Sequence, residues 1–168
     1  MAKPPRLRRK PDDPLVFVLD ENVATGENKS FGVVNATAGA RALLLRGAFS
    51  REDLAEDYRW VPKAAQNRWI LLTRDERILR VPAELDALIV SGAWGVFVTA
   101  KDLTGDQLAA LLATALPKII RLVQKYDATR ALVVTVGLAG KPDVKWGNRR
   151  YPPKPVRKLS LASKTHAP

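Results

Sequence analysis

The chain has 168 residues, of which 46% are hydrophobic and 27% are charged, and its formal net charge is +11. These proportions are typical of a globular protein and exclude a wholly disordered chain, a collagen and a coiled coil. The absence of cysteine excludes a disulfide framework and cysteine-based zinc sites. The single histidine, His166, argues against a Ser-His-Asp triad and a histidine-rich metal centre. Catalysis would therefore rest on carboxylates, hydroxyls, lysine or arginine.

The positive charge is concentrated at the two ends of the chain. Residues 1–14 carry five Lys or Arg against two Asp, and residues 141–168 carry eight against one. The segment between them, 15–140, is nearly neutral, with 15 basic and 14 acidic residues. Both ends are also rich in proline, and such segments resist packing. We therefore expect a globular domain over 15–140 between two basic tails that contact a polyanion such as RNA; purely solubilising tails are the alternative.

The first half of the expected domain contains one strand and two helices. Residues 15–19 (LVFVL) form a continuous apolar run, which predicts a strand buried on both faces. Residues 24–35 are expected to form a loop or an irregular helix start, and residues 36–47 (ATAGARALLLRG) a helix that ends at a glycine. Another helix is expected over 58–67, where Pro62 would be compatible only with the first turn.

The second half of the domain alternates between strands and helices. Strands are expected over 69–73, 94–99 and 131–136, and helices over 83–91 and 104–126. The longest helix contains a proline, which should kink or split it. The alternation indicates an α/β fold, and we expect a three-layer α/β/α sandwich around a mostly parallel central sheet.

Acidic residues follow two of the predicted strands. Asp20 and Glu21 come directly after the strand over 15–19, and Asp75 follows the strand over 69–73. Open parallel sheets bind ligands beyond the carboxyl ends of their strands. Carboxylates held close together repel one another unless a cation is present, and Mg²⁺ or Mn²⁺ suits a donor set made of oxygen alone. A metal site at this edge is one interpretation; helix caps or a solvated acidic face are the other.

Three sequence patterns extend this interpretation. Residues 17–22 read FxxDEN, residues 57–64 read DxxWxPxA, and residues 69–84 read WxxLTRDxRIxRxPxE. Together these patterns resemble the PIN-like domains of the VapC-type toxin group. The resemblance extends over residues 15–137, and its second and third patterns are specific only in combination.

The resemblance implies a fold, an activity and a set of site residues. PIN domains are small α/β/α sandwiches, and many are ribonucleases whose three or four acidic side chains hold Mg²⁺ or Mn²⁺. By resemblance, Asp20, Asp57 and Asp75 are the expected metal ligands and catalytic residues, and Thr73 is expected to orient the site. The function expected is a metal-dependent endoribonuclease, the toxin of a toxin–antitoxin pair, that cleaves RNA with a metal-activated water.

The fourth acid of many PIN nucleases has no clear counterpart in this chain. Glu21 is one candidate, and Asp102, after the strand over 94–99, is another, although helix capping explains Asp102 equally well. Some PIN-like domains have lost catalysis and only bind. The alternative function is therefore a catalytically incomplete module that binds RNA or a ribonucleoprotein through its basic tails.

Basic residues suggest where RNA would bind. By resemblance, Arg74 and Arg77 are candidates to contact substrate phosphates. Arg149 and Arg150 lie near Trp146, which could stack on an unpaired base or, equally, hold the tail against the domain. The expected partners are RNA and an antitoxin protein that covers the acidic edge. The sequence does not decide between a monomer and a homodimer. No apolar run approaches the length of a membrane span and no secretory signal is recognisable, so we expect a cytoplasmic protein without a membrane partner.

Overall fold

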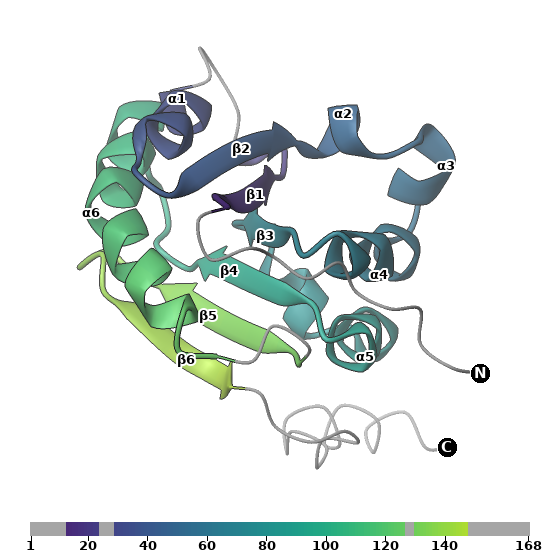
Figure 1. Cartoon of the computed structure of the whole chain (residues 1–168). Coiled ribbons are helices and arrows are strands. Elements are labelled where there is room, and N and C mark those ends of the chain that lie inside the picture. The colour runs from purple at the N-terminus through teal and green to yellow at the C-terminus, as the bar shows by residue number, and fades with distance from the viewer. Residues whose placement is uncertain (1–12, 24–28, 127–129, 148–168) are drawn as a thin grey trace, which may run out of the picture.

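The computed structural model describes residues 13–23, 29–126 and 130–147 (Figure 1). For Asp57, Tyr58 and Trp146 this description covers the backbone and not the side chain. Six strands form one sheet in the order β2-β1-β3-β4-β5-β6, in which the first five strands are parallel and β6 is antiparallel to β5. The strands are β1 (Leu15–Leu19), β2 (Ala40–Leu44), β3 (Ile70–Thr73), β4 (Trp94–Val98), β5 (Leu132–Val136) and β6 (Pro142–Gly147).

Helices cover both faces of the sheet. Figure 1 shows α1 (Lys29–Ala36) and α6 (Gly105–Val123) on one face, and α4 (Asp57–Gln66) and α5 (Pro82–Ser91) on the other. The short helices α2 (Leu45–Ala48) and α3 (Arg51–Leu54) lead from β2 to α4, and a 3₁₀ helix, η1 (Glu76–Leu79), follows β3. The expected α/β fold with a mostly parallel central sheet is thus confirmed, and its layers form an α/β/α sandwich.

The central strands are apolar because both of their faces are buried. Successive side chains of a strand point to opposite faces of the sheet. Phe17 and Leu19 therefore pack on the side of α1 and α6, whereas Val18 packs on the side of α4 with Trp60, which is 2% exposed. This arrangement explains why the β1 sequence shows no polar alternation.

The helix predicted over 36–47 is wrong. Residues Ala40–Leu44 form β2, which pairs in parallel with the whole length of β1, and only Leu45–Ala48 are helical. The backbone N–H of Leu15 donates to the carbonyl of Gly39 at 2.8 Å, which anchors the start of this pairing. The sequence ARALL favours a helix locally, but pairing with a buried neighbour strand outweighs such a weak preference.

Two prolines also differ from their predicted roles. Pro62 lies in the interior of α4, beyond the first turn to which it was assigned. Pro117 does not split α6, which continues through it to Val123. The carbonyl that Pro117 deprives of a hydrogen bond belongs to Ala113, and because both residues are exposed, water can reach it.

The predicted C-terminal tail begins too early. Residues 142–147 form β6, in which Pro142 lies opposite Val136 and Val144 opposite Val134. Proline is tolerated at the first residue of an edge strand, where no N–H is needed. Partly buried Val144 packs against the core on the α6 side. The folded domain therefore extends at least to Gly147; residues 1–12 and 148–168 of the predicted tails lie outside the described residues.

Within the described part of the chain, no helix is both long enough and apolar enough to cross a bilayer.

The packing of β6 can be tested by paired substitutions on its two faces. Val144→Ser removes apolar contacts with the core and should lower the free energy of unfolding by about 1–2 kcal/mol, or roughly 3–8 °C in Tm. Lys145→Ser, on the exposed face of the same strand, should change it by less than about 0.5 kcal/mol. Thermal unfolding followed by circular dichroism measures both. Equal effects of the two variants would show that β6 is not part of the core.

Candidate functional site

The candidate site lies where the chain reverses its course through the sheet. β1 has β2 on one side and β3 on the other, so the strand order switches between β1 and β3, and open parallel sheets bind ligands at the carboxyl ends of strands beside such a switch. Leu19 lies opposite Leu72 in this register, and the backbone N–H of Asp20 donates to the carbonyl of Leu72 at 3.1 Å. The first residue after β1 therefore meets the last residue of β3, Thr73.

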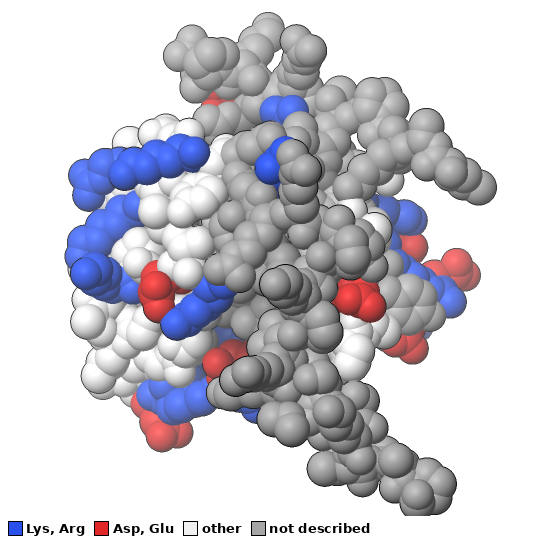
Figure 2. Space-filling view, turned by 90° about the horizontal axis from the view of Figure 1, so that it is seen from below, with Lys and Arg blue, Asp and Glu red and all other residues white. Residues whose placement is uncertain are grey.

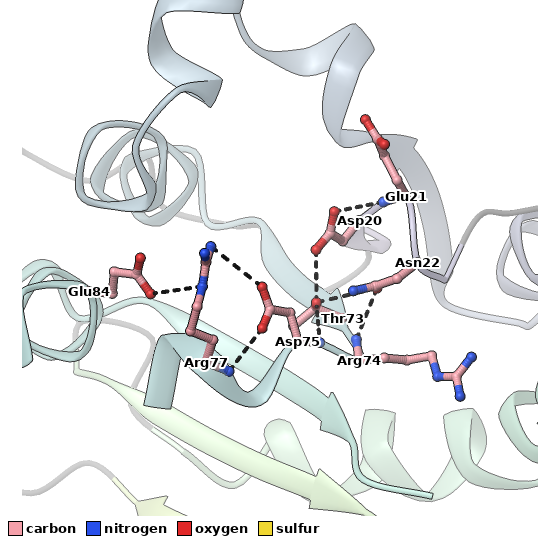
Figure 3. A network of polar contacts seen from close by, with 8 residues as sticks. All are labelled: Asp20, Glu21, Asn22, Thr73, Arg74, Asp75, Arg77 and Glu84. Atoms are coloured by element: carbon pink, nitrogen blue, oxygen red, sulfur yellow. Dashed lines mark hydrogen bonds and ion pairs between the residues drawn. The ribbon is translucent and has the colours of Figure 1, made fainter. Parts of the chain in front are cut away.

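Thr73 connects the carboxylate of Asp20 to the backbone of Asp75. Its side chain is fully buried, and its hydroxyl donates to Oδ2 of Asp20 at 3.0 Å (Figure 3). The same hydroxyl accepts from the backbone N–H of Asp75 at 2.9 Å. One hydroxyl therefore positions both the Asp20 carboxylate and the loop that carries Asp75, and the role of Thr73 in orienting a catalytic site stays a prediction.

Asn22 forms a second connection between the ends of β1 and β3, and the sequence analysis did not assign it a role. Its Oδ1 accepts from the backbone N–H of Arg74 at 3.1 Å and lies 3.5 Å from the hydroxyl of Thr73. Asparagine side chains commonly hydrogen-bond to backbone groups in turns. The signal was present in the sequence, because Asn22 completes the FxxDEN pattern.

Hydrogen bonds position both oxygens of the Asp20 carboxylate. Its Oδ1 accepts from the backbone N–H of Glu21 at 2.7 Å, and its Oδ2 accepts from Thr73. Carboxylate oxygens are ligands that Mg²⁺ prefers. The bonds also restrict rotation of the carboxylate, which reduces the entropy lost on binding.

Asp75 is held by the 3₁₀ turn that follows it. Its Oδ1 accepts from the backbone N–H of Arg77 at 2.9 Å, so Asp75 is the N-cap of η1. Its Oδ2 lies 3.7 Å from Nη2 of Arg77. The Asp75 side chain remains 33% exposed, so it is accessible at the edge of the sheet.

Arg77 lies between two carboxylates. Besides Asp75, its Nε is 3.9 Å from Oε2 of Glu84, whose side chain is only 13% exposed. Glu84 belongs to α5 and was quoted in the third sequence pattern without a role. Arg77 therefore offsets negative charge at this edge, and its predicted contact with substrate phosphate stays a prediction.

The guanidinium of Arg74 points away from Asp20 and Asp75 in Figure 3. No ion pair joins it to a carboxylate within the described ranges, so it is available to an anionic ligand. Arg149 and Arg150, the other predicted RNA contacts, lie outside the described residues.

Glu21 and Asp102, the two candidates for the fourth acid, stay predictions. Glu21 forms an ion pair with Arg46 of α2, and its side chain points away from Asp20 in Figure 3. Asp102 is exposed and has a φ of 56° in the loop before α6. It does not cap that helix: Thr104 does, in a capping box with Gln107.

The position of Asp57 is shown by its backbone alone. Asp57 is the first residue of α4, which leads into β3 and so begins at the carboxyl edge of the parallel strands. Asp53, four residues earlier in the chain, forms an ion pair with Lys63, whose ammonium lies 2.6 Å from its Oδ2. This hydrogen bond lowers the pKa of the Asp53 carboxyl. Asp53 thus joins α3 to α4.

The oxygen donors at this edge suit a hard divalent cation. Among the described side chains, no three of the Asp, Glu, His or Cys type gather as a metal-binding cluster. Asp20 and Asp75 are connected through Thr73, and Mg²⁺ is commonly held by one or two carboxylates together with water. The predicted ligand set of Asp20, Asp57 and Asp75 therefore stays a prediction that the chemistry of these donors fits.

A family comparison agrees with this arrangement. The family model described as "PIN like domain" matches residues 15–100. The chain belongs to the family of PIN-like domains. The match runs from β1 to the end of β4, and so includes Asp20, Asp57, Thr73 and Asp75. It does not single out the VapC toxin group, and no curated protein or solved structure matches the chain.

The role of Thr73 in this PIN-like domain can be tested without any activity. Thr73→Val preserves the shape of the side chain but leaves the N–H of Asp75 without its acceptor, which should cost about 1–3 kcal/mol of unfolding free energy. Thr73→Ser retains the hydroxyl and loses one methyl, which should cost only about 0.8 kcal/mol. Urea unfolding compares them. If Thr73→Val were the more stable variant, the hydrogen bonds of the Thr73 hydroxyl would not be what stabilises the ends of β1 and β3.

Proposed function

We propose that this PIN-like domain is a metal-dependent endoribonuclease. The observation that carries the proposal is the Thr73 bridge, which places Asp20 and Asp75 together at the switch in strand order. Metal-dependent ribonucleases are common among PIN-like domains, and the match covers both residues. The start of α4 at the same edge supports Asp57 as a third ligand.

The proposed mechanism divides the work between carboxylates and arginines. Asp20, Asp57 and Asp75 would hold Mg²⁺ or Mn²⁺, which activates water and stabilises charge on a phosphoryl oxygen. Thr73 restrains Asp20 and Asp75 so that they are oriented before the metal binds. The guanidinium of Arg74, which points away from Asp20 and Asp75, would bind the substrate phosphate, with Arg77 as a second candidate.

A toxin of the VapC type is the finer form of this proposal. The carboxylate edge is partly exposed, so an antitoxin protein could cover it and insert a basic group between Asp20 and Asp75. In this form of the proposal the protein acts on RNA in the cytoplasm, and a homodimer is compatible with it.

A second candidate function is a PIN-like module that binds RNA or a ribonucleoprotein without cleaving it. The observation that favours it is that no three carboxylates form a cluster among the described side chains. Metal-dependent cleavage distinguishes the two functions, because binding alone needs no metal.

Cleavage of RNA should depend on the carboxylates of Asp20 and Asp75. With a fluorescent single-stranded RNA and Mg²⁺ or Mn²⁺, Asp20→Asn and Asp75→Asn should each lower the cleavage rate by about 100-fold or more. Asp86→Asn, at an exposed position on α5, is the matched control and should leave the rate unchanged. RNA binding measured without metal should be similar in all variants.

The opposite result would be equally clear. If the wild-type protein bound RNA but neither metal supported cleavage, the nuclease proposal would fail for that substrate and the binding module would be favoured. If Asp86→Asn lost as much activity as Asp75→Asn, the carboxylate edge would have no special role.

Metal binding can be measured separately from cleavage. For a Kd of about 1 mM, 10 mM Mg²⁺ should stabilise the folded protein by about 1.4 kcal/mol, or roughly 3–6 °C in Tm. Asp20→Asn should lose this shift, whereas Asp86→Asn should retain it. A shift that persisted in Asp20→Asn would place the bound ion elsewhere.

A further inference from the structure

A shallow groove of about 270 Å³ runs between α6 and the start of β6. Four cationic side chains line it, and two apolar residues lie among them: the set is Lys118, Arg121, Leu122, Lys125, Lys141 and Pro142. Figure 2 shows Lys and Arg side chains gathered on the α6 side of the molecule. We call this feature the α6–β6 groove.

Three cations of the groove lie at the end of α6. Lys118 and Arg121 are three residues apart on the helix, which places them on the same side, and Lys125 follows the last helical residue, Val123. All three side chains are exposed. Together they form a row of cations along the chain, which suits a ligand with several negative charges in succession.

The cations of the groove differ from other cations of the domain. Lys29, Lys63 and Lys101 each form an ion pair with a carboxylate, whereas no ion pair joins the four groove cations to a carboxylate within residues 13–23, 29–126 and 130–147. Asp143, on β6, is paired with Lys145 at 2.6 Å. Since the segment 15–140 is nearly neutral, these uncompensated charges concentrate positive potential on one surface.

Stabilisation of the helix does not account for the whole groove. Basic residues near the C-terminus of a helix interact favourably with its dipole, which would explain Arg121 and Lys125. It would not explain Lys141, which lies on the turn between β5 and β6. Cations from two separate elements converge here, which is what a groove for an anion requires.

Lys141 also lines a cavity that lies toward the candidate active site. This second cavity, of about 750 Å³, is also lined by Glu76, Thr99 and Gly137. Glu76 directly follows Asp75, and Thr99 and Gly137 follow β4 and β5 at the carboxyl edge. α6 begins at this edge with Gly105, and Lys118 lies about 20 Å from Gly105 along the helix axis.

We propose that the α6–β6 groove binds the backbone of single-stranded RNA that extends from the candidate active site. The row of cations would contact successive phosphates, and the apolar surfaces of Leu122 and Pro142 would pack against ribose or an unpaired base. The inference deepens the proposed function by naming the site that holds the substrate away from the cleaved bond. Binding in the groove does not itself require catalysis.

The test compares two double variants of the full chain that remove the same charge. Arg121→Gln with Lys125→Gln removes two groove cations, and Arg41→Gln with Arg51→Gln removes two exposed cations from β2 and α3. The probe is a fluorescein-labelled 20-nucleotide oligouridine in EDTA, and its anisotropy gives Kd between 0.05 and 0.3 M NaCl. EDTA removes any contribution from metal or cleavage.

The groove variant should reduce the slope of log Kd against log[NaCl] by about 1.4, which corresponds to roughly tenfold weaker binding at 0.15 M salt. The control variant should bind within about twofold of the wild type. If the wild type also cleaves RNA with metal, the groove variant should raise KM and leave kcat unchanged. The anisotropy result stands even if no cleavage is found, so failure of the nuclease proposal remains distinguishable.

Two results would overturn the inference. Equal weakening by the two variants, or no weakening by either, would show that the groove is not a specific RNA contact. Competition by polyglutamate as effective as by unlabelled oligouridine would also reject RNA as its ligand. Both substitutions lie on exposed positions, and thermal unfolding of the groove variant verifies that the fold is retained.

Discussion

The site depends on one buried hydroxyl between two parallel strands. Thr73 is enclosed at the end of β3, where an unpaired polar group would cost a few kcal/mol, so its hydrogen bonds to Asp20 and to the N–H of Asp75 are needed for stability as well as for geometry. These bonds require the observed register of β1 and β3. A slip by one residue would turn the side chain to the opposite face of the sheet. The constraint that stabilises the strand pair thus also links the carboxylate of Asp20 to the loop that carries Asp75.

Charge is arranged differently at the two surfaces that the proposals involve. At the carboxylate edge, Arg77 lies between Asp75 and Glu84, and Arg46 pairs with Glu21, so negative groups there have cationic neighbours. In the α6–β6 groove, cations have no carboxylate partner among the described residues. The first arrangement permits carboxylates to lie close together; the second attracts a polyanion. In the proposed nuclease the carboxylate edge cleaves RNA and the α6–β6 groove binds it. Because the two surfaces are separate, substitutions can alter binding and cleavage independently.

Membership in the PIN-like family supports the chemistry without establishing it, because a fold can retain its architecture after its site has changed. In this chain, two of the three expected acids are connected through Thr73, and the third begins α4 at the same edge. Glu21 pairs with Arg46, and Asp102 lies in the loop before α6. Catalysis would therefore rely on a small set of carboxylates, for which Mg²⁺, with its retained waters, is a suitable ion.

Local sequence determined the buried strands β1, β3, β4 and β5, because each is a short apolar run, and it placed Asp20, Thr73 and Asp75 at strand ends, where parallel strands present their ligands. It could not determine β2 or β6. The residues of β2 have a helical preference, and those of β6 look like part of a basic tail, so both become strands only by pairing with β1 and β5. The contact of Asn22 with Arg74, 52 residues apart in sequence, also depended on the β1–β3 register. Tertiary structure decided these features because pairing with a distant strand, rather than the preference of neighbouring residues, stabilises them.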